Sequence, residues 1–289
     1  MTKILEKWQL SEHVFRMRLE APLIAKARRA GQFVILRVED EWGERIPLTI
    51  ADADPVAGTI DIVFQAVGAT TSQLAALSAG ETVADLVGPL GRPTEIRRVG
   101  TVIVVGGGIG IAPAHPIAEA MRAAGNRVVA IVGARNAGLV IMEAEMRRAA
   151  DEVVVMTEDG SAGRRGLVTE PLRERLEALR AQGPAALAAT EVIAVGPPVM
   201  MRFVAETTRP FGVKTVVSLN AIMIDGTGMC GGCRVKVGGE TRFVCVDGPE
   251  FDAHQVDFDS FVSRLSAFRE EETRHRCRLF GVSGREVAR

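Results

Sequence analysis

The first hundred residues of the chain carry short stretches in which hydrophobic and polar positions alternate, and Pro and Gly separate these stretches. Alternation over such lengths is typical of half-buried strands, and several short strands in succession predict an antiparallel β-barrel. A helix is expected near residues 71–80, where Gly80 would end it. The expected strands cover residues 13–21, 31–39, 45–54 and 58–68.

From residue 100 onward, apolar runs alternate with segments whose hydrophobic residues recur at helical spacing. This order predicts a parallel sheet with helices on its faces, and such sheets bind ligands at the carboxyl ends of their strands. We expect helices over residues 112–125 and 142–152. The strands are expected over residues 101–108, 127–136, 153–161 and 191–198.

The C-terminal part of the chain changes character again. Residues 218–253 are rich in Gly and contain three of the four Cys residues, whereas residues 260–281 have the pattern of a charged helix. The pattern therefore divides the chain into four parts. They are a β-barrel domain (1–98), an α/β domain (99–216), a cysteine module (217–265) and a helical tail (266–289).

Composition narrows the classes of partner. A chain of 289 residues, 47% of them hydrophobic, is long enough for two folded domains. The net charge of −1 gives no basic surface, so neither nucleic acid nor an anionic membrane is expected as a partner. No apolar run reaches the roughly 18 residues of a membrane-spanning helix, and acidic residues interrupt the N-terminus where a signal peptide would be apolar. We therefore expect a cytoplasmic protein.

Three cysteines lie close together, with the spacing Cys230-x2-Cys233-x11-Cys245. A disulfide framework would spread its pairs along the chain, and the cytoplasm would keep them reduced. Glycines between the first two cysteines allow backbone N–H groups to turn toward the sulfur atoms, as metal and iron–sulfur loops require. The spacing predicts a metal or cluster site, and it leaves Cys277 as an incidental thiol.

Asp225 precedes Cys230 at the distance of the first cysteine in the C-x4-C-x2-C spacing of plant-type ferredoxins. Ferric iron accepts carboxylate oxygen, so an aspartate in this place is a reasonable iron ligand. Two alternatives remain open: Asp225 is a turn residue before Gly226, or the cysteines bind zinc together with His254. The predicted iron ligands are Asp225, Cys230, Cys233 and Cys245.

A glycine-rich turn joins the first strand of the expected α/β domain to its first helix. Such a turn lets a nucleotide approach the backbone, and the helix N-terminus favours its pyrophosphate, although a structural turn would give the same pattern. Later strand ends at residues 157–161 and 196–198 strengthen the prediction of a nucleotide cleft. The candidate nucleotide-binding residues are Gly107, Gly108, Gly110, Ala112, Pro113, Glu158, Asp159, Gly160, Gly196 and Pro197.

Arg135 lies near the end of the second strand of the expected α/β domain. Its guanidinium could bind the 2′-phosphate of NADP(H), contact an adenine or remain solvated. The choice between NAD(H) and NADP(H) therefore stays open at this point.

Two segments of the expected barrel have the residue types of a flavin site. The Thr49 hydroxyl would hydrogen-bond to flavin N5 and Arg45 would bind a phosphate, and the same segment contains Pro47 and Leu48. A second segment, at the start of the expected helix, would hold a pyrophosphate or form an ordinary N-cap. Its candidate residues are Gly68, Thr70, Thr71 and Ser72.

The order of barrel, nucleotide domain and cysteine loop resembles the ferredoxin–NADP reductase superfamily, and within it the branch of dihydroorotate dehydrogenase electron-transfer subunits. Asp225 in place of the first of four cluster cysteines is similar to the small subunits of NADH-dependent reduced ferredoxin:NADP oxidoreductases. The likeness covers nearly the whole chain up to about residue 265. The segments that carry it are residues 45–52, 88–91, 106–113, 159–163, 196–197 and 219–235.

This resemblance implies an oxidoreductase subunit that carries FAD, binds NAD(H), and holds a [2Fe-2S] cluster with three cysteines and Asp225. Hydride exchange at the flavin beside Thr49 would be followed by single-electron steps through the cluster. The resemblance also implies a larger partner subunit, with a second FAD and [4Fe-4S] clusters, in a complex that bifurcates electrons from NADPH to ferredoxin and NAD.

Two alternatives to this function remain. One is an electron-transfer subunit of dihydroorotate dehydrogenase or of another partner oxidoreductase. The other is a nucleotide-binding regulator that zinc stabilises and that has no redox activity.

Overall fold

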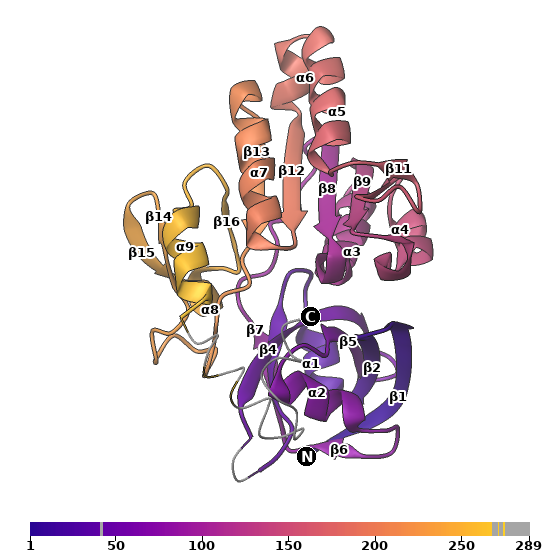
Figure 1. Cartoon of the computed structure of the whole chain (residues 1–289), viewed down its shortest axis with the longest axis vertical. Helices are drawn as coiled ribbons and strands as arrows, with labels where there is room; N and C mark the ends of the chain where they lie inside the picture. The colour runs from indigo at the N-terminus through magenta and orange to yellow at the C-terminus, as the bar shows by residue number, and fades with distance from the viewer. Residues whose placement is uncertain (41–42, 268–270, 272–273, 275–289) are drawn as a thin grey trace.

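The computed structural model describes residues 1–40, 43–267, 271 and 274 of the chain (Figure 1). Its N-terminal part is a seven-stranded antiparallel sheet that curls into a nearly closed barrel, with strand order β6-β1-β2-β5-β4-β3-β7. The antiparallel barrel predicted from the sequence is thus confirmed. The strands are β1 (Thr2–Ser11), β2 (Val14–Glu20), β3 (Phe33–Arg37), β4 (Arg45–Asp54), β5 (Thr59–Gln65), β6 (Thr82–Val83) and β7 (Asp85–Leu90).

The barrel core consists of alternate residues of its strands. Met17 of β2 pairs with Ile62 of β5, and Leu19 pairs with Ile60, and all four side chains are fully buried. The intervening positions of β2 are arginines that reach solvent, which is the pattern expected for a strand with one buried face. Two short helices complete the barrel domain, α1 (Pro22–Ala27) and α2 (Ala69–Ala76).

The helix expected near residues 71–80 ends earlier than predicted. It begins at Ala69 and ends at Ala76, because Leu77 is already extended with φ −68° and ψ 148°. Gly80 has φ 96° and donates its N–H to the Ile4 carbonyl at 2.8 Å, which joins the turn to β1. The prediction was wrong because a glycine with positive φ serves a following turn as well as a helix end.

The second sheet forms the predicted α/β domain. Its order is β11-β10-β9-β8-β12-β13-β16, and the first six strands run parallel while β16 is antiparallel to β13. The first strand of this sheet along the chain, β8, lies in its middle. The strands from β9 to β11 are added on one side of β8, and those from β12 onward on its other side. The strands are β8 (Thr101–Gly107), β9 (Arg127–Ala134), β10 (Glu152–Thr157), β11 (Arg164–Arg165), β12 (Thr190–Val195), β13 (Lys214–Ser218) and β16 (Glu250–Asp252).

Helices cover both faces of this sheet, because its central strands are apolar on both faces. In β8, Val102 and Val104 pack in the cluster that contains α3 and α4, whereas Ile103 and Val105 pack in the cluster that contains α5 and α7. Neither β13 nor the helices from α5 to α7 were among the predicted elements. The helices are α3 (Ile111–Ala123), α4 (Glu143–Ala149), α5 (Thr169–Ala181), α6 (Pro184–Ala188) and α7 (Pro198–Thr208).

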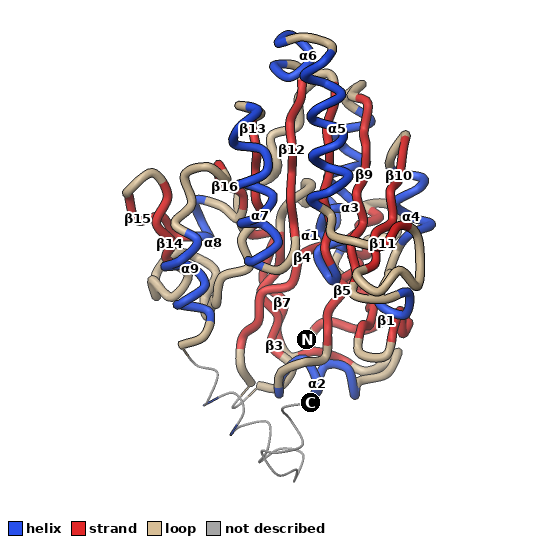
Figure 2. Tube along the Cα trace, turned by 45° about the horizontal axis from the view of Figure 1, so that its top comes forward, coloured by secondary structure: helices blue, strands red, loops and turns tan. Residues whose placement is uncertain are grey.

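The cysteine module forms a lobe beside α7 (Figure 2). It contains a hairpin of β14 (Arg234–Val237) and β15 (Glu240–Phe243), followed by α8 (Val244–Asp247) and α9 (Phe258–Leu265). Between these helices the chain returns through β16 to the edge of the parallel sheet, so residues 250–252 belong to that sheet although the expected boundary lies at 216. The helix expected over 260–281 ends at Leu265, and most of its remainder, with Cys277, lies outside the described residues.

The barrel packs against the α/β domain through α3 and β4. Ala51 of β4 and Val63 of β5 share a buried apolar cluster with Ile117 of α3, and Arg16 pairs with Glu145 of α4 at 3.7 Å. The carboxyl ends of β8 and β12 therefore point toward the barrel (Figure 1). Within the part of the chain that the structure describes, no helix is long and apolar enough to cross a membrane.

Glu250 is a buried carboxyl group where β16 meets the linker between the two sheets. Its Oε1 accepts a hydrogen bond from the Thr94 hydroxyl at 2.5 Å, and the charged groups that act on it are Glu191 and Lys214. Burial raises the pKa of Glu250 from its ordinary value of 4.5 to about 7. The folded protein therefore holds a proton on Glu250 at pH values where the unfolded chain releases it.

We expect the free energy of unfolding to fall as the pH rises from about 5 to about 8, because the folded state binds the additional proton in this window. Glu250→Gln keeps a hydrogen-bond acceptor for Thr94 and removes the titration. It should be more stable than the parent at pH 8 by on the order of 2 kcal/mol, with little difference at pH 5. Urea unfolding of both proteins across this range measures the effect, and parallel pH curves would contradict it.

Candidate functional site

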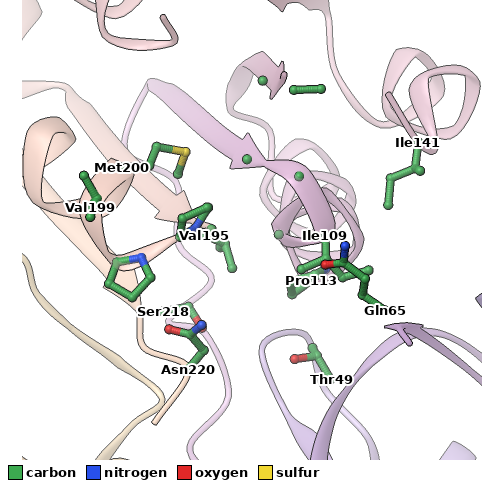
Figure 3. A pocket seen from close by; sticks show the side chains of 18 of the residues that line it. Thr49, Gln65, Ile109, Pro113, Ile141, Val195, Val199, Met200, Ser218 and Asn220 are labelled. Atoms are coloured by element: carbon green, nitrogen blue, oxygen red, sulfur yellow. The ribbon is translucent and has the colours of Figure 1, made fainter. Parts of the chain in front are cut away.

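A large cavity lies between the barrel and the carboxyl ends of the parallel strands (Figure 3). Its volume is about 1180 Å³, which exceeds the space that one small ligand needs. Thr49 of β4, Val195 at the end of β12 and Ser218 at the end of β13 line it from different sides. It thus lies at the topological switch point between β8 and β12, where open α/β sheets bind ligands.

The glycine turn after β8 forms one wall of the cavity. A Cβ atom on Gly110 would lie 2.6 Å from the Val195 carbonyl carbon and 2.7 Å from the Gly196 Cα, so no side chain fits there. An added Cβ on Gly107 would meet the side chains of Met200 and Pro197, whereas at Gly108 nothing lies within 4 Å. The backbone at Gly108 is therefore open to the cavity, which suits a pyrophosphate. Of the predicted residues in this region, Gly107, Gly108, Gly110, Pro113, Gly196 and Pro197 line the cavity, whereas Ala112 is buried in α3.

The ends of β9 and β10 contribute the charged groups of the lining, Arg135 and Glu158. The Glu158 N–H donates to the Ala134 carbonyl at 3.2 Å, which holds the two strand ends together. The predicted residues Asp159 and Gly160 lie outside the lining. Asp159 accepts hydrogen bonds from the side chain and N–H of Ser161, and these bonds lower its pKa. We conclude that Asp159 shapes the loop.

The first predicted flavin segment reaches the cavity in part. Pro47, Leu48 and Thr49 line the cavity, and Thr49 pairs with Phe33 of β3, which also lines it. Arg45 lies outside the lining and forms an ion pair with Asp85 at 3.2 Å. Its role in phosphate binding stays a prediction.

The second predicted flavin segment caps α2. The Thr71 hydroxyl oxygen accepts from the Gly68 N–H at 3.0 Å and lies at the cavity wall, as expected for an N-terminal cap. Thr70 is buried and donates its hydroxyl to Glu44 at 2.7 Å. Gly68, Thr70 and Ser72 lie outside the lining, so the structure brings Thr71 of this segment to the cavity.

The cysteine loop places two thiols face to face. Cys233 and Cys245 are buried with their sulfur atoms 3.2 Å apart, and the Cys245 N–H donates to the Cys233 sulfur at 3.4 Å. The Gly232 N–H donates to the sulfur of the exposed Cys230, also at 3.4 Å. Burial, together with the Cys233 thiol, raises the pKa of Cys245 to about 12.

Asp225 belongs to the same loop. Its carboxylate accepts hydrogen bonds from the N–H groups of Thr227 at 2.9 Å and Cys230 at 2.8 Å, and these bonds lower its pKa. The turn interpretation of Asp225 thus has direct geometric support, and the ligand interpretation stays a prediction.

The structure does not support the alternative in which the cysteines bind zinc together with His254. His254 instead forms a hydrogen bond with the Thr208 hydroxyl at 2.9 Å. No group of three or more His, Cys, Asp and Glu side chains among the residues described is arranged around a single ion position. The paired thiols and inward N–H groups fit an iron–sulfur cluster, whose ligands are divided between several irons.

Several cavity residues were not among the predicted ones. Ser218 ends β13 and Asn220 follows it by two residues, Gln65 ends β5 opposite them, and Met200 and Phe203 come from α7. A signal for Ser218 and Asn220 exists, because residues after a parallel strand meet at the ligand-binding edge. It was missed because β13 itself was not predicted.

Comparison with known proteins agrees with this geometry. Residues 104–206 match the oxidoreductase NAD-binding domain, and residues 220–257 match the iron–sulfur cluster binding domain of dihydroorotate dehydrogenase B. A dihydroorotate dehydrogenase B (NAD+) electron transfer subunit homolog from Thermotoga maritima is 44% identical over 276 residues, which cover 94% of this chain and 93% of that protein. The dihydroorotate dehydrogenase B (NAD+) electron transfer subunit of Bacillus caldolyticus is 34% identical over 86% of this chain and 94% of its own length.

A solved structure of an NADH-dependent reduced ferredoxin-NADP oxidoreductase, described for its flavin-based electron bifurcation, superposes with a TM-score of 0.88. It is 42% identical and covers 97% of this chain and 98% of that one. The NAD-binding and iron–sulfur domains expected from the sequence are confirmed, which leaves a regulator without redox activity unsupported. The chain belongs to the family of dihydroorotate dehydrogenase B electron-transfer subunits and their homologues, with the fold of ferredoxin–NADP reductases, and is a subunit of an oxidoreductase.

Proposed function

We propose that this subunit carries FAD and a [2Fe-2S] cluster and passes electrons between NAD(H) and a larger partner subunit. The observation that carries the proposal is the continuity of the cavity. The flavin segment at Thr49 and the glycine turn at Gly107 line it together with residues 218–223, which lead directly into the cysteine loop. A flavin and a nicotinamide that meet in this space would lie next to the cluster site.

The residues of the chain have distinct roles in this proposal. The N–H groups of the turn at Gly107 and Gly110 bind the pyrophosphate of the nucleotide, and the Thr49 hydroxyl hydrogen-bonds to flavin N5. Asp225 and the three cysteines hold the irons. When bound, the flavin accepts two electrons as hydride and releases them singly, which matches a cluster that takes one. Met200 and Phe203 give this side of the site an apolar wall.

The cavity wall favours NAD(H) over NADP(H). The Glu158 carboxylate can accept hydrogen bonds from the ribose hydroxyls and would repel a 2′-phosphate. Arg164, which could otherwise attract that phosphate, is held by Glu174 with two hydrogen bonds at 2.7 and 2.8 Å. Arg135 is then free to contact the adenine.

An apolar rim around the exposed Cys230 supports docking of a partner there. Ile224, Met229 and Val246 expose 58%, 88% and 38% of their surface, and a group of exposed apolar side chains is typical of a protein interaction site. We propose a larger subunit with a second FAD and [4Fe-4S] clusters as this partner, in a complex that bifurcates electrons and reduces ferredoxin. Cysteines that bind a cluster rather than form disulfides suit the reducing cytoplasm, where we place the complex.

A second candidate is an electron-transfer subunit for dihydroorotate dehydrogenase itself. The relatives that bear this name support it. We favour the ferredoxin:NADP complex because Asp225 stands in place of the first cluster cysteine, and because its solved structure aligns with 97% of the chain at a TM-score of 0.88. The partner that copurifies with the native protein distinguishes the two.

The test is anaerobic purification, followed by assays of iron, zinc and FAD and by EPR after addition of NADH. We expect about two irons and one FAD per chain and a one-electron [2Fe-2S] signal. Purified protein that contains zinc without iron, or that contains no flavin, would contradict the proposal. In Asp225→Cys the cluster should remain with an altered signal, whereas an unchanged signal would leave Asp225 as a turn residue only.

A further inference from the structure

We propose that Asn220 binds the carboxamide group of the nicotinamide ring and thereby orients the ring for hydride exchange. The proposal rests on the proposed function, because it assigns one end of the nucleotide to one side chain. Asn220 follows β13 by two residues, and Figure 3 shows it across the cavity from Thr49. A ring held by Asn220 would thus face the flavin segment.

The backbone around Asn220 is held firmly. The Leu219 N–H donates to the Pro249 carbonyl at 2.9 Å, and the side chains of Leu219 and Ala221 are buried at 3% and 7% exposure. Asn220 is the exposed residue between these two buried neighbours, and it lines the cavity. In the described parts of the chain its amide has no hydrogen-bond partner, so both its N–H donors and its oxygen are available to a ligand.

The charges of the cavity assign its two ends to different parts of a nucleotide. Its charged side chains in the described residues are Arg135 and Glu158, both at the ends of β9 and β10. The end near the barrel offers uncharged polar groups among apolar side chains, and these are Thr49, Gln65, Thr71, Ser218 and Asn220. The nicotinamide is a flat apolar ring with one amide substituent, so it fits the barrel end, and the adenosine half fits the charged end.

An asparagine suits this task better than a charged residue. The nicotinamide ring is positive when oxidised and neutral when reduced, so a carboxylate or an ammonium group would favour one of the two states. A neutral amide donates to the carboxamide oxygen and accepts from its NH2 group in both states. Asn220 therefore fixes the ring without displacing the equilibrium between NAD+ and NADH.

The test compares NAD+ with ADP-ribose, which lacks the nicotinamide ring. Asn220→Ala should weaken binding of NAD+ by about tenfold, as the loss of one to two hydrogen bonds predicts, and should leave ADP-ribose binding unchanged. Calorimetric titration of the FAD-loaded protein measures both. In the parent, 3-acetylpyridine adenine dinucleotide, which lacks the amide NH2 group, should bind more weakly than NAD+, and Asn220→Ala should remove that preference.

Three outcomes would overturn the assignment. Equal weakening of ADP-ribose and NAD+ would mean that Asn220 shapes the loop. A loss of FAD or a shifted flavin absorption spectrum, with NAD+ affinity unchanged, would place Asn220 against the flavin. If the parent protein binds neither NAD+ nor ADP-ribose, the proposed nucleotide site itself fails, and the role of Asn220 fails with it.

Discussion

Replacement of Cys233 by Ser is expected to abolish the iron–sulfur cluster while FAD and NADH still bind. The Cys233 side chain is 2% exposed, and its sulfur lies 3.2 Å from that of Cys245, so no other side chain can take its place. A hydroxyl is a poor replacement for a soft thiolate ligand, and the iron content should fall by at least about tenfold. Iron and acid-labile sulfide per chain, with the EPR signal after dithionite, measure the loss.

Cys277→Ser is the matched control, because the sequence leaves Cys277 as an incidental thiol. This variant should keep the full cluster. Retention of the cluster in Cys233→Ser, or its loss in Cys277→Ser, would assign the ligands differently. FAD content, together with a circular dichroism spectrum, separates the loss of the cluster from a general failure to fold. This control is needed because Gly226 of the cysteine loop packs against Ile35 and Leu90 of the barrel.

The second large effect is expected for Gly110→Ala. The added Cβ would press on backbone atoms of Val195 and Gly196, 2.6 and 2.7 Å away, and backbone cannot move aside as a flexible side chain does. The turn after β8 would shift away from the end of β12, and a shift of this size should weaken NADH binding by about 100-fold. Stability should fall by about 1–3 kcal/mol.

Gly138→Ala provides the comparison for this variant. Its added Cβ would lie 3.4 Å from the Asn136 side chain, an ordinary contact, and Gly138 does not line the cavity. We expect NADH affinity and unfolding free energy close to the parent values. If Gly110→Ala binds NADH as tightly as Gly138→Ala does, the turn is not the pyrophosphate site.

The pattern of apolar and polar residues predicted the layers of this fold because it reflects burial directly. In β8, the residues at 102 and 104 face one helix layer and those at 103 and 105 face the other, so a continuous apolar run was the right signal for a parallel strand. The strand β13 (Lys214–Ser218) was not predicted because it begins with a charged residue and its five residues are too few to show a period. The helix α2 was placed too far along the chain because Gly80 was taken as its end.

Site residues could be predicted wherever one short segment of the sequence contains all the groups that act together. The glycine turn and the cysteine spacing are of this kind, since neighbouring residues provide all the groups. Asn220 was missed because β13, which it follows, was not predicted, and it comes to face Thr49 through the packing of two domains. Gln65 lies on β5, next to the strand of Thr49, and no motif marks it. For Asp225, spacing favours an iron ligand, whereas its hydrogen bonds to Thr227 and Cys230 also satisfy a turn. Sequence alone leaves that choice to experiment.

The return of the chain through β16 has a consequence for biosynthesis. During synthesis, β13 leaves the ribosome well before Glu250–Asp252, and until then its outer edge offers unpaired N–H and C=O groups to any other strand. A gene truncated after residue 218, the last residue of β13, would leave that edge permanently open. We therefore expect such a fragment to aggregate. By carrying β16, the cysteine module also protects the exposed edge of the nucleotide domain from pairing with other chains.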